Sequence, residues 1–301
     1  MAGRSGVGIV QQKRGLLYVV ATPIGNLGDI TDRALKVLAK VDLIAAEDTR
    51  ETRKLLAHFG IRTRLFAYHD HNETAAAAPL IEMLEQGRDL ALVSDAGTPL
   101  ISDPGYTLVR AARDKGIRVV PIPGASAALC ALSAAGLPSD RFLFLGFPPR
   151  TPSQRRAWIE SAASEPGTLV LYESGKRVTE TLAAVSEVLG DERRVVVGRE
   201  LTKRFETFLF GSAGDLSRRL REDEEQRLGE LVILVEGAAG AVAGDLGEQA
   251  RVLRLLAEEL PLRQAAALGA RLTGAKKNAL YRLGLDLGLG QKERGAPSRS
   301  D

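Results

Sequence analysis

The chain has 301 residues, of which 45% are hydrophobic and 26% charged, which is a globular composition long enough for two domains. Its single cysteine, Cys130, excludes an intrachain disulfide, and the absence of a cysteine or histidine cluster predicts no metal site and favours a cytoplasmic location. Apolar runs stop well short of the roughly 20 residues that span a bilayer, so we expect no membrane segment. The formal net charge of +3 is too small to indicate nucleic-acid binding by itself.

Short apolar, β-branched runs alternate with helical patterns from the start of the chain. LLYVVAT, DLIAAED and RLFAY are separated by helical segments near residues 30–40 and 49–59. This alternation is typical of an α/β domain with a mainly parallel sheet. Asp29 is placed to cap the first helix, and Gly60 and Gly116 are placed to end helices.

The stretch LVSDAGTPLISDPG, residues 92–105, follows the next predicted strand. We interpret Asp103 as an N-cap and Pro104 as the first residue of a helix that runs to about Lys115. The part before it is then a long loop at the carboxyl end of a strand, where α/β sheets bind ligands. IRVVPIP is the next strand, and GASAALCALSAAG is a helix of small residues that must pack closely.

The loop has the composition of a binding surface for a neutral or cationic ligand. It contains Gly97 and the pairs Thr98-Pro99 and Asp103-Pro104, and it has no Lys or Arg. Neither GxGxxG after the first strand nor GxxxxGK[ST] occurs, which argues against a dinucleotide or P-loop site. A turn that only caps and rigidifies is the alternative. A second small-residue loop, PIPGASAAL, favours a shared binding surface.

Two further regions follow the first domain. Strand and helix patterns from residues 138 to 237 predict a second α/β domain, GAAGAVAGDLGE predicts a linker, and the remainder is helical. Residues 271–301 hold seven Lys or Arg against three Asp or Glu, and the helices that meet at Thr273-Gly274 form a helix-turn-helix or a plain helical hairpin. We expect domains at 15–137, 138–239 and 246–290, with a disordered extension at 1–14 and a disordered tail at 291–301.

The motifs TPIGNLGDIT, AAEDTR, HDHNE, SDAGTPLISDPG, PIPGAS, YES and KKNALY occur in this order between about residues 16 and 283. Together they closely resemble the tetrapyrrole methylase superfamily, and within it the members that modify ribosomal RNA. The resemblance implies two α/β domains with S-adenosylmethionine (SAM) in the cleft between them, a homodimer, and an added helical segment. It also implies methyl transfer to the ribose 2′-hydroxyl of a cytidine in the decoding region of 16S ribosomal RNA, within the small subunit.

The resemblance assigns cofactor-binding residues to the ends of strands in both domains. The AGTPLIS loop and the PIPGAS loop carry most of them, and three further positions lie at comparable strand ends. The expected set is Pro23, Gly97, Pro99, Leu100, Ile101, Ser102, Ser126, Ala127, Tyr172 and Leu231. The chain departs from the family pattern at YESGKR, where YESPHR is expected, so Gly175 and Lys176 exclude a catalytic histidine there.

Methyl transfer to a hydroxyl needs an aligned nucleophile and is assisted by a base. The candidates for that base are His69, Asp48 and Glu173, with His71 as a further histidine, whereas Asp70 or Asn72 is interpreted as a helix cap. For Asp48 and its neighbour Arg50, a capped helix with an ion pair is an equally good interpretation. The expected RNA contacts are basic or polar residues from all three regions: Arg50, Lys176, Arg199, Lys203, Arg204, Lys276, Lys277 and Asn278.

Two other functions remain open at this point. Methylation of a corrin or porphyrin precursor is the chemistry for which the superfamily is named, but a free small molecule does not require a basic helical segment. A non-catalytic ribosome-binding or nucleic-acid-binding protein with a helix-turn-helix is the other, and it would bind RNA without SAM.

Overall fold

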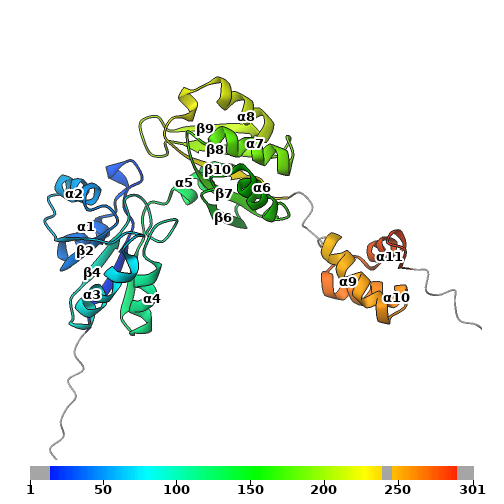
Figure 1. The fold of residues 1–301 in the computed structure, drawn as a ribbon, viewed down its shortest axis with the longest axis horizontal. Helices are drawn as coiled ribbons and strands as arrows, with labels where there is room; N and C mark the ends of the chain where they lie inside the picture. The colour runs from blue at the N-terminus through cyan, green and yellow to red at the C-terminus, as the bar shows by residue number, and fades with distance from the viewer. Residues whose placement is uncertain (1–13, 239–245, 290–301) are drawn as a thin grey trace, which may run out of the picture. The chain divides into compact units, whose positions relative to one another are not determined.

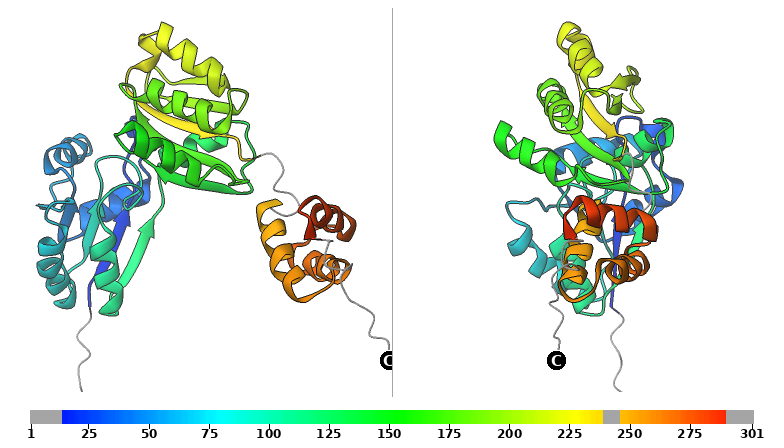
Figure 2. Two further views of the ribbon diagram at one scale, coloured as in Figure 1. Left: turned by 45° about the vertical axis from the view of Figure 1, so that its right-hand side comes forward. Right: turned by 90° about the vertical axis from the view of Figure 1, so that its right-hand side faces the viewer.

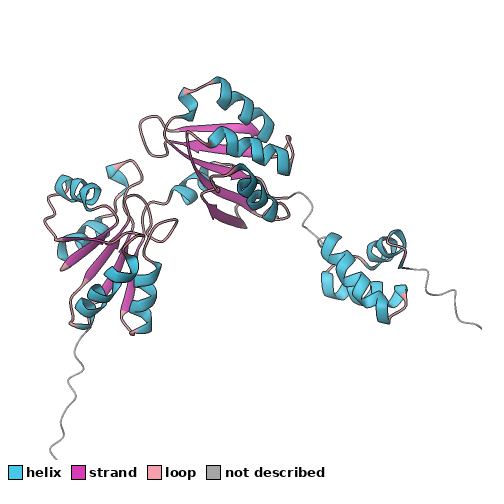
Figure 3. Cartoon of the chain, viewed as in Figure 1, coloured by secondary structure: helices cyan, strands magenta, loops and turns pink. Residues whose placement is uncertain are grey.

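The structure is a computed structural model that describes residues 14–238 and 246–289 (Figure 1). The predicted terminal segments and most of the predicted linker lie outside these residues. The described chain divides into two compact units, one containing both α/β sheets and one containing the C-terminal helices. Secondary structure is shown in Figure 3.

The first sheet is entirely parallel, as the alternation of strands and helices predicts. Its strand order is β3-β2-β4-β1-β5. Because every strand runs in the same direction, all the carboxyl-terminal loops emerge at one edge, and the loops quoted above are among them. The strands are β1 (Leu16–Val20), β2 (Leu43–Ala46), β3 (Leu65–Ala67), β4 (Leu90–Val93) and β5 (Arg118–Ile122).

Helices cover both faces of this sheet, because alternate side chains of its strands point to opposite sides. Leu90 and Leu92 of β4 pack with α3 (Glu73–Glu85) and α4 (Tyr106–Asp114). Ala91 and Val93 of the same strand pack on the other face with α1 (Asp32–Lys40) and α2 (Thr49–His58). The core of the first sheet therefore lies in two layers.

Two predicted helix caps are wrong. The side chain of Thr31 caps α1 by accepting a hydrogen bond from the N–H of Ala34, and Asp29 instead lies in a short 3-10 turn, η1 (Leu27–Asp29). Helix α4 begins at Tyr106 after Gly105 rather than at Pro104. By contrast, Gly60 and Gly116 follow α2 and α4 with left-handed φ angles of 68° and 66°, which confirms them as helix ends.

The second sheet is mixed, with strand order β6-β7-β10-β8-β9. Only β6 and β7 are parallel, whereas β10 runs antiparallel to both β7 and β8, and β8 runs antiparallel to β9. Chain connections therefore lie at both ends of this sheet. The strands are β6 (Phe142–Gly146), β7 (Thr168–Ser174), β8 (Arg194–Arg199), β9 (Thr207–Ser212) and β10 (Glu230–Val235).

The small-residue helix predicted after β5 is α5 (Ala127–Ala134), and it packs on the second sheet. Its Ala128 and Ala131 lie against Val170 and Val232, so the small side chains allow the close packing that the sequence predicts. Three further helices follow strands of this sheet: α6 (Pro152–Ser161), α7 (Val178–Leu189) and α8 (Ala213–Glu222). A short 3-10 turn, η2 (Glu225–Arg227), precedes β10.

The C-terminal unit is a small helical bundle (Figure 2). It consists of α9 (Leu246–Glu259), α10 (Leu262–Thr273) and α11 (Lys277–Asp286). Its core is formed by buried residues of all three helices, including Leu253, Leu262 and Leu280. Helix α10 ends at Gly274, which has a left-handed φ of 72°, so the turn predicted at Thr273-Gly274 is confirmed.

Candidate active site

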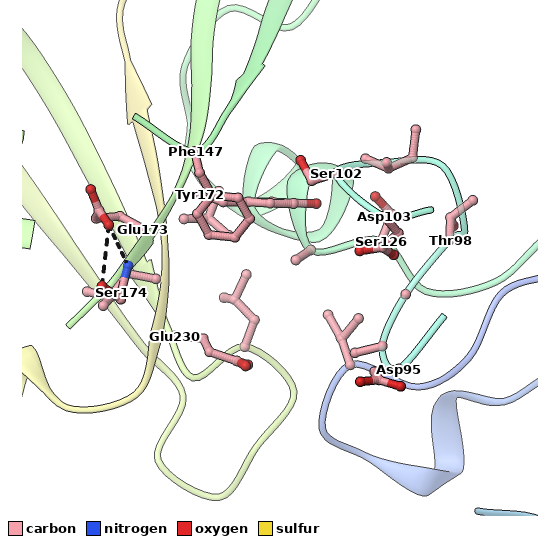
Figure 4. A pocket seen from close by; sticks show the side chains of 18 of the residues that line it. Asp95, Thr98, Ser102, Asp103, Ser126, Phe147, Tyr172, Glu173, Ser174 and Glu230 are labelled. Carbon is pink, nitrogen blue, oxygen red and sulfur yellow. Dashed lines mark hydrogen bonds between the residues drawn. The ribbon is translucent and has the colours of Figure 1, made fainter. Parts of the chain in front are cut away.

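A pocket of about 400 Å³ lies among loops of both sheets (Figure 4). This volume is in the range of about 300–1,000 Å³ that suits one small organic ligand. The first sheet contributes polar and small residues, and the second contributes aromatic and apolar ones. The lining comprises Ile24, Glu47, Asp95, Ala96, Gly97, Thr98, Ile101, Ser102, Asp103, Ser126, Ala127, Phe147, Tyr172, Glu173, Ser174, Leu201, Glu230, Leu231 and Val232.

The loop after β4 is fixed to the loop after β1 at Gly97. The N–H groups of Thr22 and Gly97 donate to each other's carbonyl oxygens at 2.8 and 3.0 Å. Gly97 has a φ of 85°, and a Cβ atom there would lie 3.3 Å from a methyl group of Ile24. The position therefore favours glycine both for its backbone conformation and for the space beside the pocket.

Left-handed backbone marks two segments of the pocket wall. Among the described residues, the non-glycine positions with positive φ are Leu100, Ser102, Glu200 and Thr202. Each pair flanks one apolar residue of the pocket lining, Ile101 in the first case and Leu201 in the second. Such conformations cost about 1 kcal/mol or more each, and they concentrate where a functional geometry is required.

Carboxylates line the pocket on the side of the first sheet. Burial raises the pKa of Asp103 to about 6, and the nearby charges of Glu47 and Asp95 act in the same direction. Burial also raises the pKa values of Glu47 and Asp95. No Lys or Arg lines this pocket. The pocket wall therefore carries the negative potential that the lysine-free loop predicts, which suits a cationic ligand.

Asp103 faces the pocket because another carboxylate performs its predicted capping role. Oε1 of Glu73 accepts hydrogen bonds from the N–H groups of Gly105 and Thr107 at 2.9 and 3.1 Å, at the start of α4. The hydroxyl of the buried Tyr68 donates to the same oxygen at 2.9 Å. Glu73 belongs to the HDHNE motif, so part of that motif holds the loop, and Asp103 is not used to cap α4.

Aromatic rings form the opposite wall. The ring of Tyr172 lies edge-on to Phe144 and Phe147, with centroid separations of 4.9 and 5.5 Å. Its hydroxyl accepts a hydrogen bond of 3.2 Å from the N–H of Ala128 at the start of α5. Burial raises the pKa of Tyr172, so this hydroxyl stays protonated at neutral pH. Figure 4 shows Tyr172 and Phe147 facing the side that carries Asp103 and Ser126.

Glu173 lines the pocket, but its carboxylate is already occupied by neighbours. Thr181 donates to Oε2 at 2.6 Å, the N–H of Ser174 donates to Oε1 at 2.8 Å, and the guanidinium of Arg177 lies 3.4 Å from Oε2. The side chain is fully buried. These contacts anchor the turn after β7, which is a structural role for a residue that the sequence offers as a base.

The departure YESGKR has a structural explanation. The N–H of Gly175 donates a 3.1 Å hydrogen bond to the carbonyl of Gly229. A Cβ atom on Gly175 would lie 1.4 Å from the carbonyl oxygen of Arg227. A proline at this position has no N–H to donate and would overlap that oxygen. The segment before β10 therefore requires glycine in this chain.

The predicted cofactor residues divide into two groups. Gly97, Ile101, Ser102, Ser126, Ala127, Tyr172 and Leu231 line the pocket. Pro23, Pro99 and Leu100 are not part of the lining; Leu100 packs instead against the core of the first sheet.

Of the candidate bases, only Glu173 lines the pocket. Asp48 caps α2 and pairs with the exposed Arg50, whose guanidinium lowers the pKa of the carboxyl, so the structure shows the capped helix with an ion pair. His69 lies outside the lining, its ring 6.0 Å from that of His71. Asn72 occupies the N-cap position of α3, but its side chain bonds to the N–H of His69 rather than to the helix.

The residues predicted to contact RNA differ in whether their side chains are already bonded within the protein. Nζ of Lys203 lies between Glu200 and Glu230 at 2.9 and 3.0 Å, so its charge is paired. Arg199 donates to the carbonyl groups of Leu228 and Phe205. Arg50, as described, is ion-paired. The side chains that are exposed without such a pairing role are Lys176, Arg204, Lys276, Lys277 and Asn278.

The sequence did not identify several residues of the lining: Ile24, Glu47, Asp95, Thr98, Phe147, Leu201 and Glu230. Asp95 and Thr98 could have been predicted, because both belong to the stretch of residues 92–105 whose composition indicates a binding loop. Phe147 follows β6, Leu201 follows β8 and Glu230 begins β10, so no local pattern brings them together.

Comparison with known proteins defines the class. The family model described as tetrapyrrole (corrin/porphyrin) methylases matches residues 16–217, and the RsmI C-terminal HTH domain matches residues 243–288. The chain belongs to the tetrapyrrole methylase family. The crystal structure of the methyltransferase CobJ has the same fold, with a TM-score of 0.56, 22% identity, and coverage of 75% of this chain and 95% of that one.

Curated relatives are similar along nearly their whole length. The ribosomal RNA small subunit methyltransferase I of Escherichia coli O157:H7 is 55% identical over 273 residues, which is 91% of this chain and 96% of the relative. The protein of the same name from Haemophilus influenzae is 54% identical, covering 90% of this chain and 96% of its own length. Within residues 14–238 and 246–289, no helix is long and apolar enough to cross a membrane.

Proposed function

We propose that this protein is a SAM-dependent methyltransferase that modifies the ribose 2′-hydroxyl of a cytidine in the decoding region of 16S ribosomal RNA, within the small subunit. The observation that carries the proposal is the similarity over 96% of a ribosomal RNA small subunit methyltransferase, which includes the C-terminal helical unit. We further propose that it acts as a homodimer in the cytoplasm.

The residues present fit the cofactor. The pocket has the volume of a small-ligand site, carries carboxylates without basic residues, and has a glycine where a side chain would crowd the wall. Gly97, Ile101, Ser102, Ser126, Ala127, Tyr172 and Leu231 would hold SAM there, with Leu201 completing the apolar surface. When bound, the cofactor supplies an electrophilic methyl group on a cationic sulfur.

The chain's own residues then position the hydroxyl and accept its proton. Of the three carboxylates that line the pocket on the side of the first sheet, Asp103 is the proposed proton acceptor. The other two are engaged with backbone: Glu47 accepts from the N–H of Asp95, and Asp95 accepts from the N–H of Asp48. Positioning supplies most of the acceleration, and a base adds to it. Lys176, Arg204, Lys276, Lys277 and Asn278 are the proposed RNA contacts.

The test is methyl transfer from labelled SAM to free 16S ribosomal RNA, small subunits and whole ribosomes. We expect label on small subunits, mapping to a ribose oxygen of a cytidine. Label on a base alone, or turnover of a tetrapyrrole precursor with inert subunits, would contradict the proposal.

A further inference from the structure

Phe147 is the most exposed large hydrophobic residue of the pocket lining. It is 57% exposed, compared with 39% for Ile101 and less than 10% for Leu201 and Leu231. Burying a phenylalanine side chain contributes about 1.5–3 kcal/mol, so an exposed phenylalanine indicates a surface that a ligand would cover. The apolar lining residues that the second sheet contributes besides Phe147, namely Leu201, Leu231 and Val232, are buried, so Phe147 forms the mouth of the pocket on that side.

The end of β6 directs this ring toward the pocket. The pairing of β6 with β7 shifts register between Phe144 and Gly146, and Gly146 has a left-handed φ of 71°. Such irregularities redirect the side chains that follow them. A Cβ atom on Gly146 would lie 3.2 Å from the hydroxyl oxygen of Ser102, so the strand ends against the loop of the first sheet. Phe147 therefore stands directly beside the proposed cofactor loop.

Two arginines hold the loop of residues 147–150 in place. The buried Arg155 donates to the carbonyl oxygens of Pro149 and Arg150 at 3.3 and 3.0 Å, and its charge is paired with Glu180 at 2.9 Å. Arg177 donates to the carbonyls of Pro148 and Pro149. With these bonds and two prolines, little conformational freedom remains to be lost when a ligand contacts Phe147.

The volume of the pocket indicates what that ligand is. A pocket of about 400 Å³ accommodates one small ligand and not a nucleotide in addition. Only the reacting ribose hydroxyl must reach the methyl group, so the base of the same nucleotide has to lie near the mouth. Sequence-specific RNA recognition commonly stacks an unpaired base on an aromatic side chain.

We infer that Phe147 is the stacking surface for the base of the nucleotide that receives the methyl group. The inference rests on the proposed function, because it requires an RNA substrate. It assigns the aromatic ring to the RNA, whereas the loop residues from Gly97 to Ser102 serve the cofactor. Phe147 is thus a substrate-binding residue, held by Arg155 and Arg177.

The test compares Phe147→Ala, Phe147→Leu and Phe147→Tyr in the full-length protein. For small ribosomal subunits, Phe147→Ala and Phe147→Leu should each lower kcat/KM about ten-fold through a higher KM, as expected for loss of one base–aromatic stack. Phe147→Tyr should retain the wild-type value. Calorimetric titration with SAM should give the wild-type Kd for all three variants.

Phe142→Ala is the matched control, because Phe142 lies at the start of β6, the strand that precedes Phe147, is 42% exposed and does not line the pocket. It should leave both measurements unchanged. Three results would overturn the inference: wild-type kinetics for Phe147→Ala, wild-type kinetics for Phe147→Leu, or an equal loss of SAM affinity in Phe147→Ala. If the wild-type enzyme does not methylate small subunits, the result contradicts the proposed function instead. In that case the affinities of the variants for small subunits, measured by sedimentation, would still test the role of Phe147.

Discussion

The two walls of the pocket are built in different ways. The wall from the first sheet consists of loops that follow parallel strands, and most of its residues come from a single loop, at positions 95–98 and 101–103. The wall from the second sheet gathers Phe147 after β6, Tyr172 within β7 and Leu201 after β8, three separate places in a mixed sheet. The first wall is therefore local in sequence, whereas the second depends on long-range contacts.

Gly175→Pro should have the largest effect, because it attacks a long-range contact of the second wall. It removes the hydrogen bond to Gly229 and overlaps the carbonyl of Arg227. We expect the free energy of unfolding to fall by about 3 kcal/mol or more in a denaturant titration. Gly60→Ala, in the first α/β domain, has a left-handed φ but free space and should cost only about 1 kcal/mol. Equal free energies of unfolding for the two variants would contradict the expectation that the contact between Gly175 and the segment before β10 is the more important one.

Gly97→Val should affect the cofactor rather than the fold. A β-branched residue at a φ of 85° is strained, and its side chain enters the pocket beside Ile24. We expect SAM affinity, measured by calorimetry, to fall about 30-fold, which corresponds to about 2 kcal/mol. Gly136→Val is the control, because Gly136 has a similar φ of 64° with no atom within 4 Å and does not line the pocket. Unchanged affinity in Gly97→Val would remove this loop from the cofactor site.

This contrast also separates what the sequence predicts from what it does not. The parallel sheet, the glycine at position 97 and the negative character of the loop follow from local patterns. The place of Asp103 in the pocket lining does not, because the predicted capping of α4 is done by Glu73, 30 positions earlier in the chain. Phe147 and Leu201 were also missed because their positions depend on contacts between distant parts of the chain. The strand order of the mixed sheet decides which connections lie next to each other.

Asp103→Asn should change the pH dependence of both stability and rate. The folded-state pKa of about 6 lies above the ordinary value of 3.8, so this carboxyl stabilises the fold below about pH 4, and that contribution is lost as the pH rises through 6. The variant should flatten this part of the stability profile and raise the free energy of unfolding at pH 7 by about 1 kcal/mol after allowance for solvent screening.

The rate should respond in the opposite direction. Methyl transfer by the wild type should rise between about pH 5 and 7 as Asp103 ionises, since the ionised form attracts a cation and accepts a proton. Asp103→Asn should be slow throughout, without this rise. If Asp103→Asn keeps the wild-type dependence of rate on pH, Asp103 is excluded as the proton acceptor. The same pH profile measured for Glu173→Gln provides the comparison with a carboxylate on the opposite wall.

Single lysines should give the smallest effects. Lys277→Met should lower the slope of log affinity for small subunits against log salt by about 1, as expected for one lost phosphate contact. Lys203→Met should leave the slope unchanged, because Glu200 and Glu230 already neutralise Lys203. SAM affinity should not change in Lys277→Met. A larger salt effect for Lys203→Met would indicate that its ion pairs open when RNA binds.

The strained tripeptides around Ile101 and Leu201 have a consequence for directed evolution. Leu100, Ser102, Glu200 and Thr202 adopt a left-handed backbone that asparagine and glycine adopt more easily. A library screened only for heat resistance should accumulate those two residues at these four positions. A library screened for methylation should keep the present side chains wherever they shape the pocket. Positions at which the two libraries select different residues would identify the residues whose strained backbone lowers stability but is required for activity.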